Sequence, residues 1–351
     1  MEGRGFYNAH SRPQQAAAGR GVALLARAAE RAGLAPAPLV IADYGAAEGR
    51  NSLAPVAAAV RVLRRRCRAP VSVVHVDRPG NDFGSLFGLL RTDPASYLAG
   101  TEDVFAYAAG GSFYDRLFPA GHVSLGWCSI ALHWLGGVPA GATGHVWPSG
   151  LAGPDREPFA RQAERDWRAF LRHRAAELRP GGRLVVVVPA TDERGAWNIE
   201  GLAARITAVL RGMVGDGVLR ETELARMVVP VYHRRAEEFE APFADPGLGL
   251  VVEERSLDRV PDPLWVAFRA SGDVAALAAG YAGFARAAFG PTLAHALDPD
   301  RSAAERRAFV ARLEAGLRVS TIAEPAALCA PVVMTMLIAK PRRSDETDEP
   351  F

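Results

Sequence analysis

The chain has 351 residues, of which 49% are hydrophobic and 23% are charged, and it is long enough to bury one large core or two smaller ones. Lys and Arg total 41 against 39 Asp and Glu, and they are spread along the chain instead of forming the basic patch that nucleic acids require. No apolar run approaches the roughly 18 residues needed to span a bilayer. We therefore expect a globular protein that binds neither nucleic acid nor membrane.

The cysteines give no sign of a disulfide or metal framework. Cys67, Cys128 and Cys329 are odd in number and lie far apart in the sequence. They can build neither a set of paired bridges nor a CxxC metal pair. This usage favours a reducing compartment, and we expect the protein to act in the cytoplasm.

Short aliphatic or β-branched runs alternate with helix-like segments in the first half of the chain. The runs lie at residues 39–43, 71–76, 123–125 and 183–188. Segments 52–66 and 157–178 carry hydrophobic residues at helical spacing, and Pro180-Gly-Gly182 is expected to stop the second helix and turn the chain into its strand. The alternation predicts an α/β fold with a doubly wound, mostly parallel sheet.

The pattern changes beyond residue 195. Helical spacing is found at 199–213, 272–289 and 303–317, and a late apolar run lies at 332–338. We interpret these helices as a cap over the ligand-binding edge of the sheet. The expected organisation is an N-terminal motif and α/β core in residues 1–195, a mainly helical cap with interspersed core elements in 196–327, a returning core strand in 328–341 and a disordered tail in 342–351.

A loop of small residues, Asp43-Tyr-Gly45-Ala-Ala-Glu-Gly49, follows the first run. Small residues let a ligand approach the backbone closely, although a plain tight turn has the same composition. The loop lacks the Lys-Ser/Thr pair of a Walker loop, and a dinucleotide site would place its acid about 20 residues on, nearer than Asp77. Asp77 is placed instead to accept hydrogen bonds from two ribose hydroxyls of an adenosine. Asp43 suits the cationic amino-acid end of S-adenosylmethionine, or a cap on the turn.

Several motifs, taken together and in order, resemble the SABATH family of salicylic acid, benzoic acid and theobromine methyltransferases. They are Tyr7-Asn-Ala-His-Ser11-Arg-Pro-Gln14, Ile41-Ala-Asp43-Tyr-Gly45 with Gly49-Arg-Asn51, Asp77-Arg-Pro-Gly-Asn-Asp-Phe83, Gly111-Ser-Phe-Tyr-Asp-Arg-Leu-Phe-Pro119, Leu132-His-Trp-Leu135 and Asp166-Trp-Arg-Ala-Phe-Leu171. The likeness is good over residues 7–190 and loose afterwards. It implies a class I methyltransferase, Rossmann-like fold with S-adenosylmethionine as cofactor, and the chain looks like a bacterial-type member.

The resemblance also implies roles for individual residues. Cofactor-binding residues are expected at Tyr7, Ser11, Asp43, Gly45, Asn51, Asp77 and Arg78, with Ser112 and Phe113 beside the adenine. Gln14 and Trp134 match the pair that holds the substrate carboxylate in the family, and His133 occupies a neighbouring position of the acceptor pocket.

The sequence departs from the family pattern at several positions. The family usually has Asn where His10 stands and often an aromatic residue where Ile130 stands, so we expect a wider or flatter acceptor pocket. Segment 225–230 aligns with plant residues that carry ligands for a structural magnesium, and His145 stands where another Asn would be. The magnesium ligands are missing, and no metal is therefore expected.

A carboxylate has a pKa of about 4, so it is already an anionic nucleophile at neutral pH and needs no general base. The side-chain amide of Gln14 and the indole N–H of Trp134 are neutral donors, which can fix a carboxylate without neutralising its charge. Considered separately, Trp134 would be a core residue and Gln14 an exposed residue at a helix start. The matched pair favours a substrate site.

We therefore predict an S-adenosylmethionine-dependent O-methyltransferase that forms the methyl ester of a small, mostly apolar and preferably aromatic carboxylic acid. The products would be the ester and S-adenosyl-L-homocysteine, and no residue is expected to act as acid or base. Two alternatives stay open: N-methylation of a small heterocycle, and a catalytically silent homologue that only binds the cofactor. We expect a homodimer.

Overall fold

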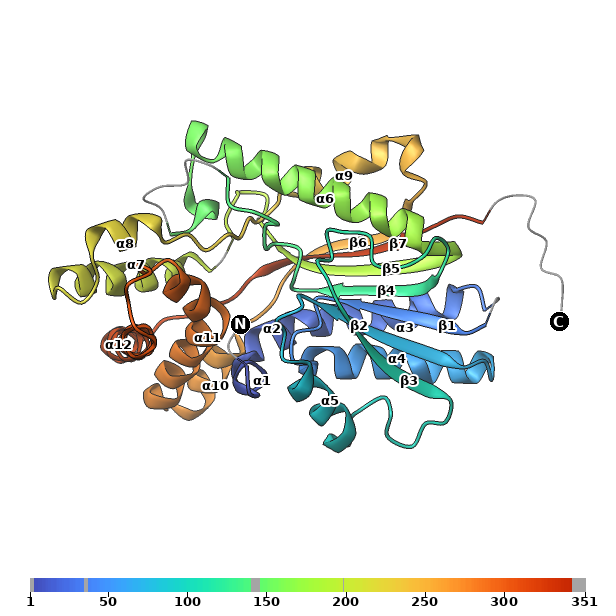
Figure 1. The fold of residues 1–351 in the computed structure, drawn as a ribbon, viewed down its shortest axis with the longest axis horizontal. Helices are drawn as coiled ribbons and strands as arrows, with labels where there is room; N and C mark the ends of the chain where they lie inside the picture. Colours follow the sequence, from blue (N-terminus) through green and yellow to red (C-terminus); the bar gives the residue numbers. More distant parts are fainter. Residues whose placement is uncertain (1–2, 35–36, 140–145, 198, 343–351) are drawn as a thin grey trace.

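A computed structural model describes residues 3–34, 37–139, 146–197 and 199–342. A seven-stranded sheet runs through the molecule in the order β3-β2-β1-β4-β5-β7-β6 (Figure 1). The strands are β1 (Leu39–Tyr44), β2 (Val71–Asp77), β3 (Val104–Gly110), β4 (Val123–Ser129), β5 (Leu178–Ala190), β6 (Val251–Arg259) and β7 (Val332–Ala339). The first five strands pair with one another in parallel, and β7 is antiparallel to both β5 and β6. The predicted mostly parallel, doubly wound sheet is confirmed.

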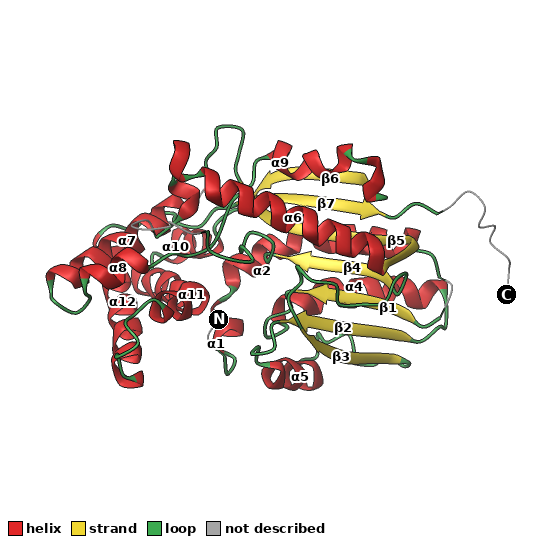
Figure 2. Cartoon of the chain, turned by 45° about the horizontal axis from the view of Figure 1, so that its top comes forward, coloured by secondary structure: helices red, strands yellow, loops and turns green. Residues whose placement is uncertain are grey.

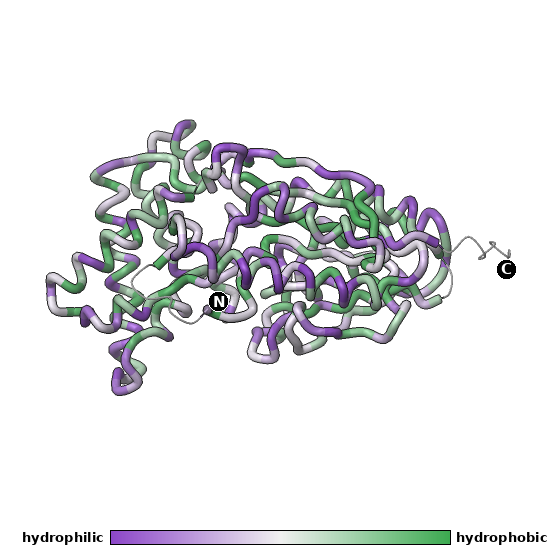
Figure 3. The backbone as a smooth tube through the Cα atoms, turned by 90° about the horizontal axis from the view of Figure 1, so that it is seen from above, coloured by the Kyte–Doolittle hydropathy of each residue, from purple (hydrophilic) through white to green (hydrophobic). Residues whose placement is uncertain are grey.

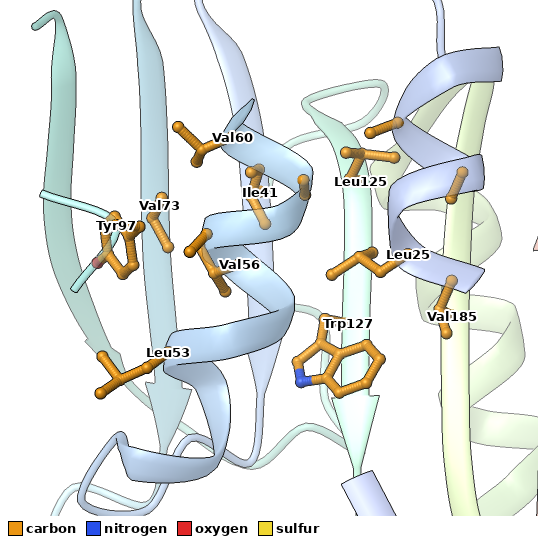
Figure 4. Packing of buried hydrophobic residues seen from close by; sticks show 14 of the residues in the cluster. Leu25, Ile41, Leu53, Val56, Val60, Val73, Tyr97, Leu125, Trp127 and Val185 are labelled. Atoms are coloured by element: carbon orange, nitrogen blue, oxygen red, sulfur yellow. The ribbon is translucent and has the colours of Figure 1, made fainter. Parts of the chain in front are cut away.

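Helices cover both faces of this sheet (Figures 1 and 2). On one face lie α3 (Val22–Arg31), α4 (Arg50–Arg66) and α5 (Phe83–Thr92), and on the other lie α6 (Glu157–Glu177) and α9 (Ala236–Glu240). Ile41 of β1 packs with the first set, as Figure 4 shows beside Val73 and Leu125, whereas the next residue, Ala42, packs with Phe170 of α6. Every residue of β1 is buried because both of its faces are covered, which explains its unbroken apolar sequence.

The two edge strands were not predicted. In β3, apolar and polar residues do not alternate regularly, and Phe105 and Tyr107 are exposed. β6 carries charges along its length, including Glu253 and Glu254. Edge strands need only one covered side and are commonly charged or irregular, so neither shows the apolar run that marked the central strands.

The remaining helices form a second apolar core at one end of the sheet (Figures 1 and 2). They are α7 (Glu200–Gly215), α8 (Glu221–Arg226), α10 (Pro263–Ser271), α11 (Val274–His295) and α12 (Ala303–Ala323). The helix predicted at 272–289 is confirmed as α11, with its start at Val274 and its end at His295. Gly272, at φ +71°, ends α10, a helix that was not predicted, and Asp273 caps the start of α11. Two short helices, α1 (Phe6–His10) and α2 (Arg12–Ala18), join these to the sheet, with α1 against α11.

The predicted turn at residues 180–182 lies inside β5 instead of before it. α6 ends at Glu177, β5 begins at once, and the pairing with β4 shifts from Val123–Leu178 to Leu125–Arg183. Gly181, at φ +74°, accommodates this irregularity. Along the backbone, hydrophobic (green) and hydrophilic (purple) stretches alternate, with much of the purple on the outside of the molecule (Figure 3). Of the tail predicted to be disordered, residues 343–351 lie outside the described residues.

Candidate active site

The predicted cofactor residues Asp43, Gly45, Asp77 and Arg78 lie where β1 and β2 end, at the carboxyl edge of the sheet. Gly45 follows β1 with φ +88°, and its N–H donates to the carbonyl of Val76 at 2.9 Å. A Cβ on Gly45 would lie 2.6 Å from Cβ of Ala131 and 3.7 Å from the ring of Phe113. Only glycine fits this backbone, and its lack of a side chain lets the loop pack directly against Ala131.

Asp77 ends β2 and is bound to the neighbouring loop. One of its carboxylate oxygens accepts from the N–H of Ala47 at 2.7 Å and the other accepts from the N–H of Arg78 at 2.8 Å. Burial raises the pKa of Asp77, while these two N–H donors oppose the shift. Each oxygen keeps a second lone pair, so the carboxylate can still accept hydrogen bonds from a diol.

Glu48 holds the N-terminal motif over this loop, a role that the sequence did not suggest. Its buried carboxylate accepts from the N–H of Gly5 at 2.9 Å and of Asn8 at 3.0 Å. Burial, and then the charges of Asp77 and Glu48, raise the pKa of the phenol of the adjacent Tyr7. Tyr7 therefore keeps its proton and offers an O–H donor. The available signal was an acidic residue within a loop of small residues.

The segment expected beside the adenine is fixed from behind by a buried ion pair. Arg174 and Glu177, in the last turn of α6, are fully buried and lie 2.8 Å apart. Arg174 donates to the carbonyl of Phe113 at 2.6 Å, and Glu177 accepts from the N–H of Leu117 at 2.6 Å. The Ser112 hydroxyl accepts from the N–H of Tyr114 at 3.2 Å. The loop that carries Ser112 and Phe113 is thus preorganised by α6.

Asp43 is buried at the end of β1 and contacts His75 of the neighbouring strand. The Oδ2 atom of Asp43 lies 2.7 Å from Nδ1 of His75. Asn51, in the first turn of α4, has a buried Oδ1 without a hydrogen-bond partner among the described residues. Leaving a buried polar atom unpaired costs about 1–3 kcal/mol, so such an atom indicates a missing ligand.

Two residues expected on the acceptor side have the same property. Oε1 of Gln14 and Nδ1 of His133 are buried and find no partner within the described parts of the chain. Both side chains are 8% exposed. Trp134 follows His133 with its ring centroid 5.8 Å away, and its carbonyl accepts from the hydroxyl of Tyr114 at 2.6 Å.

His133 and Trp134 belong to a closed circuit of six aromatic rings, which we call the aromatic wall. It comprises His133, Trp134, Trp147, Trp197, His233 and Phe289, with successive ring centroids 4.7–6.2 Å apart. Burial is the main cause that lowers the pKa of both histidines, that of His233 to about 3. Both imidazoles are therefore neutral near pH 7, and the wall carries no charge.

Two residues that depart from the family pattern, His10 and Ile130, have well-defined surroundings in the structure. His10 stacks on Phe6 and occupies the space left by Gly283 of α11, where a Cβ would lie 2.2 Å from the imidazole. Ile130, just after β4, has φ +51°, a strained conformation for a β-branched residue that costs about 1–3 kcal/mol and is typical of functional sites. Ile130 donates its N–H to the carbonyl of Val187 at 2.7 Å, which holds it there.

Within residues 3–34, 37–139, 146–197 and 199–342, no group of three or more His, Cys, Asp or Glu side chains is arranged to hold a metal ion. His145 lies outside these ranges. Over the same part of the chain, no helix has the length and apolar character to cross a membrane.

The fold and this edge of the sheet define an α/β methyltransferase. Residues 2–294 match the family model described as SAM dependent carboxyl methyltransferase, and the chain belongs to this family. S-adenosylmethionine is accordingly its cofactor, and Asp77 and the unpaired Asn51 fit that ligand.

Known proteins agree with this assignment. The chain is 30% identical over 248 residues to methyltransferase LUC1 of a Fusarium species, covering 68% of this chain and 64% of the relative. It is 29% identical to the 3,7-dimethylxanthine N-methyltransferase TCS1 of Camellia sinensis var. assamica, covering 56% and 58%. A solved loganic acid methyltransferase with SAH has the same fold, with a TM-score of 0.78, 20% identity and 99% coverage of both chains.

The two sequence matches thus span about three fifths of the relatives' own length. Both relatives come from a fungus or a plant, so the comparisons do not support the bacterial-type assignment.

Proposed function

We propose that the protein transfers the methyl group of S-adenosylmethionine to the carboxylate of a small, mostly apolar, aromatic acid. The observation that carries this proposal is the neutral aromatic wall. Its two titratable groups, His133 and His233, have lowered pKa values and are therefore poor proton acceptors. A ring N–H must lose a proton when its nitrogen is methylated, whereas a carboxylate reaches the site already ionised.

The proposed roles follow from where each side chain lies. The bound cofactor supplies an electrophilic methyl group on a positively charged sulfur. Asp77 would accept from the ribose hydroxyls, Asp43 would face the amino-acid end, and Ser112 and Phe113 would contact the adenine. Tyr7, Ser11, Asn51 and Arg78 complete the proposed cofactor site.

Gln14 and Trp134 would hold the acid by neutral N–H groups, with His133 beside them. Oε1 of Gln14 makes no hydrogen bond to a described residue that would fix the amide, so the side-chain amide can rotate and present its N–H₂ group to a bound carboxylate. The chain's own contribution is to fix the carboxylate oxygen in line with the methyl group and to exclude water. No side chain has to move a proton.

Replacing Gln14 by Ala together with Trp134 by Phe tests the acceptor assignment. We expect kcat/KM for the acid to fall because each lost donor costs about 1–3 kcal/mol at a buried carboxylate. The affinity for S-adenosylmethionine should stay near that of the parent protein. Steady-state kinetics and calorimetry measure the two quantities.

Gln15→Ala is the matched control, since Gln15 is the exposed neighbour of Gln14 and should leave kcat/KM unchanged. The amide of the same acid should not react with the parent protein, because it offers no anionic oxygen. Unchanged kcat/KM for the acid in the double variant, or a preference of the parent protein for a xanthine nitrogen, would refute carboxyl methylation and favour methylation of a ring nitrogen.

Activity should survive incubation with excess EDTA. We propose that the reaction needs no metal, because the segment at 225–230 lacks the family's magnesium ligands. Methyl transfer measured before and after chelation should agree within error. Loss of activity that added Mg²⁺ restores would refute this prediction.

We further propose that residues 1–195 form the cofactor-binding core, 196–327 the substrate-facing cap and 328–341 the returning strand. A homodimer in the cytoplasm is also proposed. Three free cysteines fit a reducing compartment. Light scattering with size-exclusion chromatography measures the oligomeric state, and a monomer at micromolar concentration would contradict the dimer.

A further inference from the structure

A buried chain of three polar side chains leads into the proposed cofactor site from the side of β2. Asp43 and His75 are paired on the neighbouring parallel strands β1 and β2. Nδ1 of His75 lies 2.7 Å from Oδ2 of Asp43, and Nε2 of His75 lies 2.8 Å from the hydroxyl of Tyr97. His75 is 0% exposed and Tyr97 is 2% exposed. Water therefore does not mediate or compete for these contacts.

The direction of the hydrogen bonds follows from the carboxylate of Asp43, which can only accept and therefore requires a proton on Nδ1 of His75. Burial, and then the charge of Asp43, raise the pKa of the Tyr97 phenol, so its hydroxyl keeps its proton. An imidazole that carries its single proton on Nδ1 accepts at Nε2, so the hydroxyl of Tyr97 donates to it. Nδ1–H in turn donates to Asp43. The bonds run in one direction and end on the carboxylate, so each strengthens the next.

In this arrangement only one of the two carboxylate oxygens of Asp43 takes part in a hydrogen bond within the described part of the chain. Oδ2 is taken by His75, while Oδ1 makes no hydrogen bond with the described residues. A carboxylate held through one oxygen has its rotamer fixed and presents the other oxygen in a constant direction. The neighbours of His75 on β2 are Val74 and Val76. An apolar residue at position 75 would avoid the free-energy cost of burying an imidazole, so the histidine indicates a function for its ring nitrogens.

We propose that His75, oriented by Tyr97, is a positioning residue that aims the free oxygen of Asp43 at the ammonium group of S-adenosylmethionine. The inference rests on the proposed role of Asp43 at the amino-acid end of the cofactor. It does not depend on which acceptor is methylated.

Two cofactor fragments separate this role from a structural one. S-adenosylhomocysteine carries the ammonium group, whereas 5′-methylthioadenosine has the same adenosine and sulfur without the amino acid. His75→Leu should weaken S-adenosylhomocysteine binding about tenfold or more, the loss expected for a charged contact, and change 5′-methylthioadenosine binding less than about twofold. Calorimetry on the full chain gives both affinities. Equal weakening of both ligands, or no change in either, would overturn the proposal.

Conservative variants sharpen the test. His75→Asn places an amide N–H where Nδ1–H stood and should restore most of the lost affinity. Tyr97→Phe removes one hydroxyl at nearly constant volume and should give a smaller loss with the same ligand selectivity, which keeps the test valid if His75→Leu does not fold. Tyr107→Phe removes a hydroxyl from an exposed tyrosine of β3 and should change nothing.

Asp43→Asn distinguishes failure of this inference from failure of its premise. If Asp43→Asn weakens S-adenosylhomocysteine but not 5′-methylthioadenosine, the role of Asp43 stands, and unchanged binding in His75→Leu and Tyr97→Phe then rejects His75 alone. If Asp43→Asn leaves both ligands unchanged, the assignment of Asp43 itself is rejected.

Discussion

Asp77→Ala is expected to lower the affinity for S-adenosylmethionine by about 10²- to 10⁴-fold. The substitution removes the proposed acceptors of two ribose hydroxyls, and a hydrogen bond to a charged group contributes about 1.5–3 kcal/mol. It also frees the N–H groups of Ala47 and Arg78, which the carboxylate now holds at 2.7 and 2.8 Å. Part of the loss would thus come from a less ordered loop. Calorimetric titration of the variant measures the total.

Asp77→Asn separates the two contributions. An amide keeps one acceptor oxygen, so we expect the affinity of Asp77→Asn for S-adenosylmethionine to lie between that of the parent protein and that of Asp77→Ala. Asp103→Asn is the matched control, because Asp103 is exposed before β3, at a positive φ that Asn tolerates. An Asp77→Ala variant that binds S-adenosylmethionine as tightly as the parent protein would refute the ribose assignment.

The part of the site that the sequence predicted is local in the chain. The apolar run of β1 and the loop from Asp43 to Gly49 are contiguous, and Asp77 is the last residue of the next strand, β2. Because parallel strands end at one edge, two such strands place these residues together without any knowledge of the tertiary structure. The resemblance to a known family then supplied Tyr7, Gln14 and Trp134, whose positions follow from no local pattern.

The parts that the sequence did not predict depend on contacts between distant segments. The aromatic wall draws Trp147, Trp197, His233 and Phe289 from separate segments. Each is an ordinary buried aromatic residue in its own segment, and only packing brings them together. The loop at Phe113 is likewise held by a helix that begins more than 40 residues later.

Breaking the buried ion pair Arg174–Glu177 should lower the free energy of unfolding substantially. Arg174→Met should destabilise the protein by about 3–5 kcal/mol, because it leaves the carboxylate of Glu177 buried without its partner. Urea unfolding followed by circular dichroism measures the free energy of unfolding. The matched control is Arg168→Met on the same helix: its ion pair with Glu164 is exposed, so the cost should be below about 1 kcal/mol.

The double variant Arg174→Met, Glu177→Leu separates stability from function. Since no lone charge remains buried, the free energy of unfolding should recover much of what the single variant lost, as apolar replacements of buried ion pairs often do. The affinity for S-adenosylmethionine should not recover, because the carbonyls of Phe113 and Asp115 lose their partner in both variants and the N–H of Leu117 loses its partner in the double variant. An affinity that returns together with stability would mean that the ion pair supports the core and does not position the adenine loop.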